Sequence, residues 1–420
     1  MYALILFLVI GLLPIFVREF RSSGQLMLTY WFLIALHQSV AIINTFVFVV
    51  PGAESDSLKF HATAVARAEA EVFFFATGAR GFENILGLVY RLFGSSVFLG
   101  SQLSILMFAI SCVVLIKILR LLELSRYKVS VMLVFGAIPS VLLFGSVILR
   151  ESYEVLFFML TTYFGLRMLI ERNITVYGFF MVMSALIMGM FHKGLFYFSA
   201  FLIPLFMMWN IYPSSGWLTI KKEYFLRVLV ILTLILSTII LKYFEYVDLP
   251  IPSSLLNAKN FWEQAVTYQK NSLTIPGRAT YGFPIDLSSP FTIAHTSFVL
   301  YLHYLFEPFP WHVKNIFDVG ASIESLLRLV LIGFSLKHLC RVHGVQFRLL
   351  FLLLILFFTM SFIWAMGTTN YGTAIRHNMV SWWILAITGT PLLMESLSRI
   401  RLGSALHRCM GFLGQAKKIS

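Results

Sequence analysis

The chain has 420 residues, of which 59% are hydrophobic and only 12% are charged, and its mean hydropathy is +0.85. Soluble domains carry about twice that share of charged residues, so the composition excludes a soluble enzyme. The formal net charge is +13, and in a polytopic membrane protein such an excess marks cytoplasmic loops and not nucleic-acid binding. Three scattered cysteines without a CxxC pair argue against a disulfide framework or a zinc site. The sequence therefore indicates an all-α, multi-span membrane protein that forms a single membrane domain, 1–420.

Apolar runs separated by charged residues or by Pro and Gly predict where the chain crosses the membrane. A helix needs about 20 predominantly apolar residues to span the hydrocarbon core. We expect eleven spans, at 2–17, 26–50, 99–118, 129–148, 153–170, 174–191, 194–212, 226–243, 319–336, 347–366 and 379–396. The first run has neither a positively charged segment before it nor a small-residue cleavage site after it, which favours a span over a signal peptide.

The distribution of charge predicts the orientation of these spans. If the connection 18–25 is cytoplasmic and the spans alternate, the cytoplasmic segments hold 19 basic residues and five acidic ones. Cytoplasmic loops of membrane proteins carry such an excess of Lys and Arg. We therefore expect the amino terminus outside, a cytoplasmic basic tail at 397–420, and two long outward loops at 51–98 and 244–318.

The segment 291–306 is apolar but is expected not to span. It carries His295 and His303, and counting it as a span would move the basic tail to the outside. Open backbone groups cannot lie bare in lipid, so we expect a re-entrant or interfacial helix in the outer leaflet. Its two histidines are then expected at headgroup depth.

Polar and ionisable residues gather at the outward ends of the predicted spans and in the two outward loops. Such groups are costly at membrane depth and often belong to functional sites. The candidate site residues are Asp56, His61, Arg150, Glu151, His192, Lys193, Arg278, Tyr281, Glu307, Trp311, Asn370, Arg376 and His377. Arginine donates paired hydrogen bonds to phosphate, and a carboxylate or imidazole beside it can take a proton from a sugar hydroxyl. The sequence has no DxD, HExxH or Walker A motif, so we expect neither a metal ion nor a cofactor.

Purely structural roles are open for several of these residues. Arg150–Glu151 could be a helix-end ion pair that closes a tight hairpin, and His192–Lys193 could extend to the headgroups. Asp56 could cap the helix expected to follow it. Arg376–His377 has the weakest structural explanation, because it lies in a Gly- and Thr-rich turn between two strongly apolar helices.

Five short motifs are spread along most of the chain. They are Asp56…His61, Pro139-Ser140…Gly145-Ser146…Arg150-Glu151, His192-Lys193-Gly194, Phe306-Glu307-Pro308-Phe309-Pro310-Trp311 and Asn370-Tyr371-Gly372-Thr373-Ala374-Ile375-Arg376-His377. Together they resemble the Wzy-type polymerases of bacterial O-antigen and exopolysaccharide repeat units, which are akin to the GT-C membrane glycosyltransferases. The resemblance implies a metal-independent reaction on the periplasmic or outer face of the bacterial inner membrane. One undecaprenyl-diphosphate-linked glycan would be transferred onto the non-reducing end of another repeat unit.

The resemblance also implies partners and residue roles. The partners would be the lipid-linked donor and acceptor glycans, membrane lipids and a chain-length regulator protein, with no nucleic acid. Asp56 maps onto the carboxylate that acts as base in GT-C enzymes, with His192 or His377 as the alternative base. Glu151 is expected as a further catalytic residue. The GT-C carboxylate usually follows the first span, whereas Asp56 follows the second. Arginines expected to bind the diphosphate are Arg150, Arg278 and Arg376. Further substrate contacts are expected from His61, Lys193, Tyr281, Glu307, Trp311 and Asn370.

Two other functions fit the same features. A GT-C transferase that adds a single sugar from a polyprenyl-phosphate donor would have nearly the same site. A transporter or flippase of lipid-linked glycans often has paired repeats and a site at the bilayer midplane, but no internal repeat is evident here. Most of the candidate ionisable residues gather at one membrane face, but Glu324 and Arg328 lie in mid-span. They indicate either one intrahelical ion pair or a transport pathway.

Overall fold

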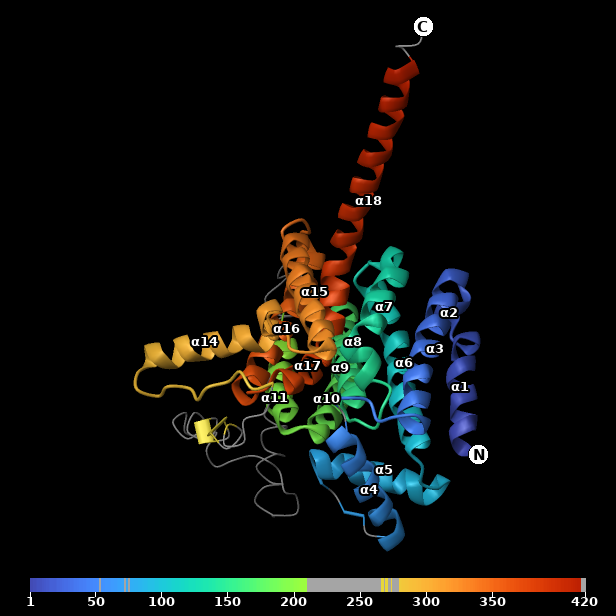
Figure 1. The fold of residues 1–420 in the computed structure, drawn as a ribbon, viewed down its shortest axis with the longest axis vertical. Coiled ribbons are helices and arrows are strands. Elements are labelled where there is room, and N and C mark those ends of the chain that lie inside the picture. Colours follow the sequence, from blue (N-terminus) through green and yellow to red (C-terminus); the bar gives the residue numbers. More distant parts are fainter. Residues whose placement is uncertain are drawn as a thin grey trace.

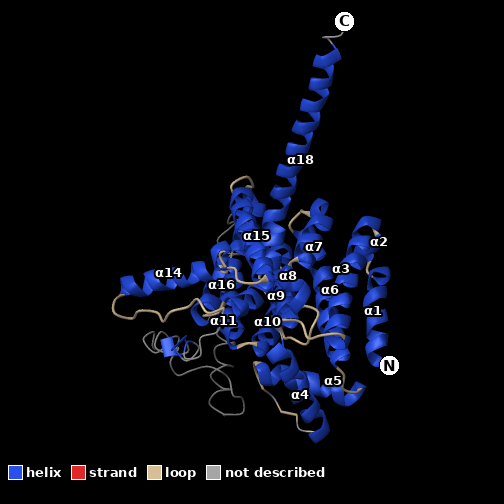
Figure 2. Ribbon diagram, viewed as in Figure 1, coloured by secondary structure: helices blue, strands red, loops and turns tan. Residues whose placement is uncertain are grey.

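The computed structural model describes residues 1–52, 54–71, 73–74, 76–209, 266–267, 269–270, 273 and 279–416, with the backbone alone for Lys193 and 400–416. Within these residues the chain is helical and contains no β-strand (Figure 2). The all-α prediction is therefore confirmed for the part described. The predicted span 226–243 and Arg278 lie outside the described residues, as does most of the part before Ala279 of the loop expected at 244–318.

The first part of the described chain forms α1 (Tyr2–Phe16), α2 (Arg18–Arg21), α3 (Gly24–Phe46), α4 (Glu54–Ala70), α5 (Ala79–Phe93), α6 (Val97–Leu121), the 3-10 turn η1 (Ser125–Tyr127), α7 (Lys128–Ala137), α8 (Pro139–Phe144), α9 (Glu151–Glu171), α10 (Ile174–Phe191) and α11 (Lys193–Met208). The last part forms α14 (Pro290–Phe306), the 3-10 turn η3 (Pro310–His312), α15 (Ile316–Leu339), α16 (Gly344–Gly367), α17 (Tyr371–Met379) and α18 (Trp382–Ala416).

Six of the described helices are long and apolar enough to cross a membrane, namely α3, α6, α9, α10, α15 and α16. The pair formed by α17 and the first part of α18 is bent by 71° and makes a seventh candidate if it counts as one span. α1 and α11 are apolar but have only 15 and 16 residues. The protein is thus a multi-pass membrane protein by the length and composition of its helices, while the expected eleven spans are not confirmed.

The predicted span 129–148 is broken into α7 and α8 at Pro139. A proline disfavours helical geometry in the residue before it, and Ile138 accordingly has an extended backbone, with φ −59° and ψ 130°. The break leaves the first N–H groups of α8 without helical partners. The Glu324 carboxylate of α15 accepts one of them, from the Ser140 nitrogen at 2.9 Å.

Glu324 and Arg328 are both buried and form one ion pair within α15, at 3.4 Å. Glu324 also accepts hydrogen bonds from the Ser140 hydroxyl at 2.7 Å and from Nε1 of Trp382 at 2.8 Å. Arg328 donates to the backbone oxygen of Leu305, and its guanidinium lies over the Trp382 ring. This pair therefore joins α15 to α8, α14 and α18, which is a structural role.

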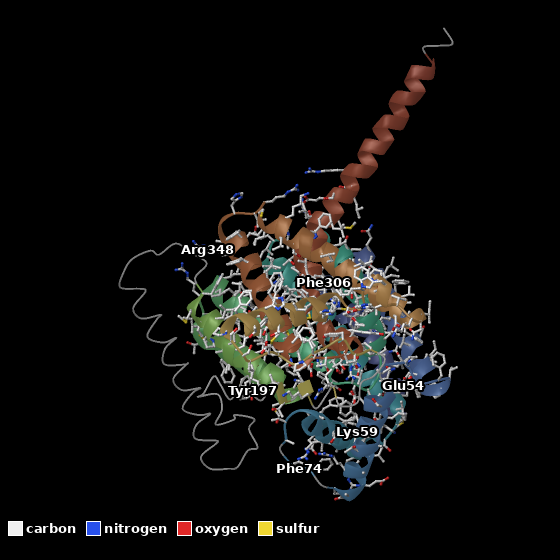
Figure 3. All side chains as sticks on the ribbon, turned by 60° about the vertical axis from the view of Figure 1, so that its left-hand side comes forward. Glu54, Lys59, Phe74, Tyr197, Phe306 and Arg348 are labelled. Carbon is white, nitrogen blue, oxygen red and sulfur yellow. The ribbon has the colours of Figure 1, made fainter. Side chains whose placement is uncertain are left out.

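The ends of the helices group at two opposite faces of the bundle. Figure 1 shows the amino terminus with α4 and α5 at the lower end, and α2, the α15–α16 turn and the far part of α18 at the upper end. Figure 3 likewise places Arg348 towards the α18 extension and Glu54 and Lys59 at the opposite end. α14 lies across the direction of α15 and α18 (Figure 1). It is not among the candidate spans.

The first outward loop, expected at 51–98, contains two helices, α4 and α5, which pack on each other as a hairpin. Arg67 on α4 donates to Glu83 on α5 at 2.7 Å and also to the Asn84 side chain. α4 begins at Glu54, so Asp56 lies in its first turn and does not precede the helix as an N-cap. The hairpin brings this first turn to the end of the bundle where α9 begins.

Candidate functional site

The candidate site is centred on Arg376 of α17, which holds two carboxylates from distant parts of the chain. Its Nη1 donates to Oδ2 of Asp56 at 2.6 Å, and its Nη2 and Nε donate to Oε1 of Glu151 at 2.6 and 3.1 Å. Glu151 is buried, with 1% of its side chain exposed, whereas the Asp56 side chain is 44% exposed. One guanidinium thus links the first turns of α4 and α9 to α17.

Local sequence explains why these groups occur at helix ends. Asn370 precedes α17, and its side-chain oxygen accepts the Gly372 N–H at 2.7 Å, as Asn does in an N-cap. Asp56 and Glu151 both lie in first turns, where a carboxylate interacts favourably with the helix dipole. The Gly- and Thr-rich turn therefore starts a helix that presents Arg376 one turn further on.

Arg150 lies beside this centre but pairs with a different carboxylate. Its Nη1 donates to the Phe191 carbonyl at 3.2 Å, and its Nε lies 3.4 Å from Oε1 of Glu154. The Glu154 side chain is buried, and neither of its oxygens has a hydrogen-bond partner in the structure. Sequence reasoning missed Glu154, although its spacing of four residues from Arg150 on an apolar helix is the signal of an ion pair. The structure therefore separates Arg150, paired with Glu154, from Glu151, paired with Arg376.

Two histidines flank Trp364 at the end of α16. The ring centroid of Trp364 lies 3.9 Å from that of His377, in a stacked arrangement, and 4.2 Å from that of His192. Nδ1 of His192 accepts the Gly194 N–H at 3.0 Å and so caps α11. The neutral form of His192 then carries its proton on Nε2, which disfavours it as a base.

His377 has the opposite tautomer. The Thr368 hydroxyl donates its one proton to the Trp364 carbonyl at 2.8 Å, so at 3.2 Å it accepts from Nδ1 of His377. Nε2 of the neutral His377 is therefore the nitrogen with a lone pair. Of the two histidines, His377 is therefore the one whose neutral ring keeps a lone pair outside these hydrogen bonds.

Of the remaining predicted residues that the structure describes, His61, Glu307 and Trp311 lie outside the Arg376 centre. Nδ1 of His61 is 2.9 Å from the Tyr90 hydroxyl, between α4 and α5, and burial there lowers the pKa of His61 below its ordinary value. Glu307 contacts His303 and His312 after α14. The Lys193 side chain and all of Arg278 lie outside the described part of the structure.

The segment that carries Tyr281 runs directly beside the turn before α17. The Tyr281 and Gly282 N–H groups both donate to the Thr369 carbonyl, at 3.0 and 3.1 Å, and the Tyr371 N–H donates to the Ala279 carbonyl at 3.0 Å. A Cβ atom on Gly282 would lie 2.7 Å from Cβ of Thr369. Only glycine permits this approach, which holds the segment from Ala279 to Gly282 against the start of the Arg376 helix.

We expect Gly282→Ala to destabilise the protein by about 1–3 kcal/mol, because the added methyl group overlaps Thr369. The matched control is Gly320→Ala, whose Cβ would meet no atom within 4 Å inside α15. That control should raise stability by up to about 1 kcal/mol, through helix propensity. Thermal unfolding in detergent should thus show a lower Tm for Gly282→Ala and an equal or higher Tm for Gly320→Ala than for the wild type. A Tm for Gly282→Ala at or above the wild-type value would contradict the close packing.

Among the described residues, no three His, Cys, Asp or Glu side chains converge where a metal ion could bind. Comparison with known proteins gives no assignment: no protein-family model, no curated protein and no solved structure matches the chain significantly.

Proposed function

We propose that the chain is a membrane glycosyltransferase that polymerises undecaprenyl-diphosphate-linked oligosaccharide repeat units on the outer face of a bacterial inner membrane. The proposed topology is the one expected from charge, with eleven spans, the amino terminus outside and the tail inside. The observation that carries the proposal is the Arg376 guanidinium held between a buried and a half-exposed carboxylate. An arginine fixed on one side and exchangeable on the other is suited to bind a diphosphate reversibly.

Glu151 is the fixed partner of Arg376, since it is buried and receives two of the three hydrogen bonds. Asp56 is the exchangeable partner, since it is half exposed and receives one bond, from Nη1. A diphosphate oxygen that takes Nη1 leaves the Asp56 carboxylate free to accept a proton. Donor binding and activation of the base are then coupled through one side chain, with Arg150 near enough to assist at the same helix end.

The proposed reaction joins the acceptor hydroxyl oxygen to the anomeric carbon of the donor glycan. The bond between that carbon and the diphosphate oxygen breaks, and undecaprenyl diphosphate leaves with the bonding electrons. The acceptor proton passes to Asp56, or to Nε2 of His377, which is the other group with a suitable lone pair. Arg376 stabilises the charge that develops on the departing diphosphate.

Purified protein in nanodiscs, incubated with the host's undecaprenyl-diphosphate repeat unit, tests the proposal. A ladder of glycans spaced by whole repeat units on a gel is the expected result. Extension by one sugar from a polyprenyl-phosphate donor would instead favour the single-sugar transferase. Intact substrate with a leaflet-specific change in its labelling would favour the flippase.

We expect Asp56→Asn to lower kcat for polymer formation by about 10²–10⁴, the usual contribution of a general base. The donor KM should stay the same or fall, because the variant removes an anion that competes for Arg376. Initial rates over a range of donor concentrations measure both constants. Asp286→Asn is the matched control, because Asp286 is exposed in a loop and its carboxylate accepts hydrogen bonds from the nearby Ser288. An unchanged kcat in Asp56→Asn, with a large loss in His377→Gln, would assign the base to His377.

A further inference from the structure

A second group of titratable side chains surrounds Glu307, at the carboxyl end of α14. Its Oε1 lies 3.1 Å from Nδ1 of His303 and 2.9 Å from Nδ1 of His312. Its Oε2 accepts the Phe309 N–H at 2.9 Å. Glu307 is buried, with 1% of its side chain exposed, whereas both histidines reach solvent. One hidden carboxylate therefore holds two accessible imidazoles.

The carboxylate also sets the tautomer of both rings. An ionised carboxylate only accepts hydrogen bonds, so Nδ1 of His303 and of His312 must each be the donor. Nε2 of each neutral ring is then an acceptor. The hydrogen bond from Nδ1 to Glu307 fixes the orientation of the ring, as in carboxylate–histidine pairs at functional sites. Histidines that only mark the headgroup depth of a membrane would need no buried partner of this kind.

An aromatic shelf adjoins the two imidazoles. The Trp311 ring is stacked on Phe309, with centroids 4.9 Å apart and planes at 7°, and Trp311 is 73% exposed. The Phe309 ring in turn meets the rings of His303 and His312 edge to face, at 5.7 and 5.9 Å. Phe309 thus packs against the Trp311 ring on one side and against both histidine rings on the other, so that the four rings form one cluster. The result is a supported indole beside two hydrogen-bonding nitrogens.

This combination matches the chemistry of a sugar ring, which has an apolar C–H face and hydroxyl groups at its edge. We propose that His303, His312 and Trp311 form a second binding site, which takes a pyranose ring of the acceptor glycan. Trp311 stacks on the ring face, and Nε2 of the two histidines accepts hydrogen bonds from its hydroxyls. Binding of a sugar requires only this geometry, whereas its role as acceptor rests on the proposed polymerase function.

The site is connected to the Arg376 centre through Tyr281. The Tyr281 ring stacks on His303, with centroids 5.6 Å apart and planes at 11°. Its hydroxyl donates to the Thr368 carbonyl at 3.2 Å, and the Thr368 hydroxyl contacts His377, next to Arg376. A glycan held at Trp311 is therefore linked to the residues proposed to bind the donor by one continuous series of contacts.

The test measures binding of the repeat-unit oligosaccharide, released from its lipid by mild acid, to the full-length protein in nanodiscs. We expect the Kd by calorimetry to rise about tenfold in Trp311→Ala, from the loss of one aromatic face. His312→Ala should weaken binding similarly, while Trp311→Phe should restore most of the affinity. Phe291→Ala is the matched control, because Phe291 is 79% exposed at the other end of α14 and has no place in the site. Its Kd should equal that of wild type.

Each outcome decides between the two proposals. An oligosaccharide that does not bind to the wild-type protein, or binds equally well to Trp311→Ala and His312→Ala, overturns the second site. If the glycan ladder forms but these variants bind normally, the polymerase stands and the second site falls. If no ladder forms but binding is lost only in the Trp311 and His312 variants, the sugar site stands and the polymerase falls.

Discussion

Arg376→Lys is expected to lower polymer formation at least about a hundredfold, while the protein still accumulates in the membrane. Lysine keeps the positive charge that Glu151 needs, because an unpaired buried carboxylate would cost about 3–5 kcal/mol. It cannot, however, reach two partners with a planar fork. The variant therefore retains the fixed ion pair and loses the side of the guanidinium that exchanges Asp56 for diphosphate. Arg376→Ala would combine both effects and so separates them less well.

The matched control for Arg376→Lys is Arg167→Lys at the other end of α9. Arg167 pairs with Glu171 four residues away at 2.6 Å, and both side chains are partly exposed. An exposed pair contributes about 0–1 kcal/mol, so this control should keep its activity and its Tm. The amount of protein in the membrane and the length of the glycan ladder are measured for both variants. A normal ladder from Arg376→Lys would remove Arg376 from the diphosphate site.

The convergence of Asp56, Glu151 and Arg376 could be anticipated from the sequence because helix ends alternate between two faces of a bundle. Residues placed at the outward ends of predicted spans share one face, whatever their distance along the chain. The structure places Arg376 in direct contact with both carboxylates. The choice of partners could not be anticipated, since sequence proximity favoured a pair between Arg150 and Glu151 and gave Arg376 no particular carboxylate. Only the packing shows that Glu151 binds Arg376, across 225 residues, while Arg150 turns to Glu154.

Groups whose roles depend on side-chain orientation were missed for a similar reason. Trp364 resembles any apolar residue of a span, yet its ring contacts both His192 and His377, which also meet each other edge to face. The α4–α5 hairpin was also only partly foreseen, because α4 is polar and α5 is amphipathic, so neither has the continuous apolar run of a span. A continuous hydrophobic run reveals a helix that faces lipid or core on all sides. It does not reveal as well a helix that packs at the end of the bundle with one polar face.

Glu324→Ala is expected to destabilise the protein by about 3–5 kcal/mol, because it leaves Arg328 buried without its carboxylate. It also removes the acceptor for the first turn of α8 at Ser140 and for the Trp382 indole. Thermal unfolding in detergent should show a Tm lower by about 5 °C or more. Glu171→Ala is the matched control, since its partner Arg167 is partly exposed and the pair contributes little.

A double variant shows whether the effect arises from the stranded charge or from lost packing. In Glu324→Leu with Arg328→Met no charge remains buried, and such apolar replacements of buried ion pairs are often neutral. The double variant should therefore recover most of the Tm lost in Glu324→Ala, apart from about 1 kcal/mol for the missing cap at α8. A double variant as unstable as the single one would show that the hydrogen bonds to Ser140 and Trp382 dominate. If Glu324→Ala itself matched Glu171→Ala, the pair would not hold α15 to α8 and α18, and its mid-helix position would again favour a transport pathway.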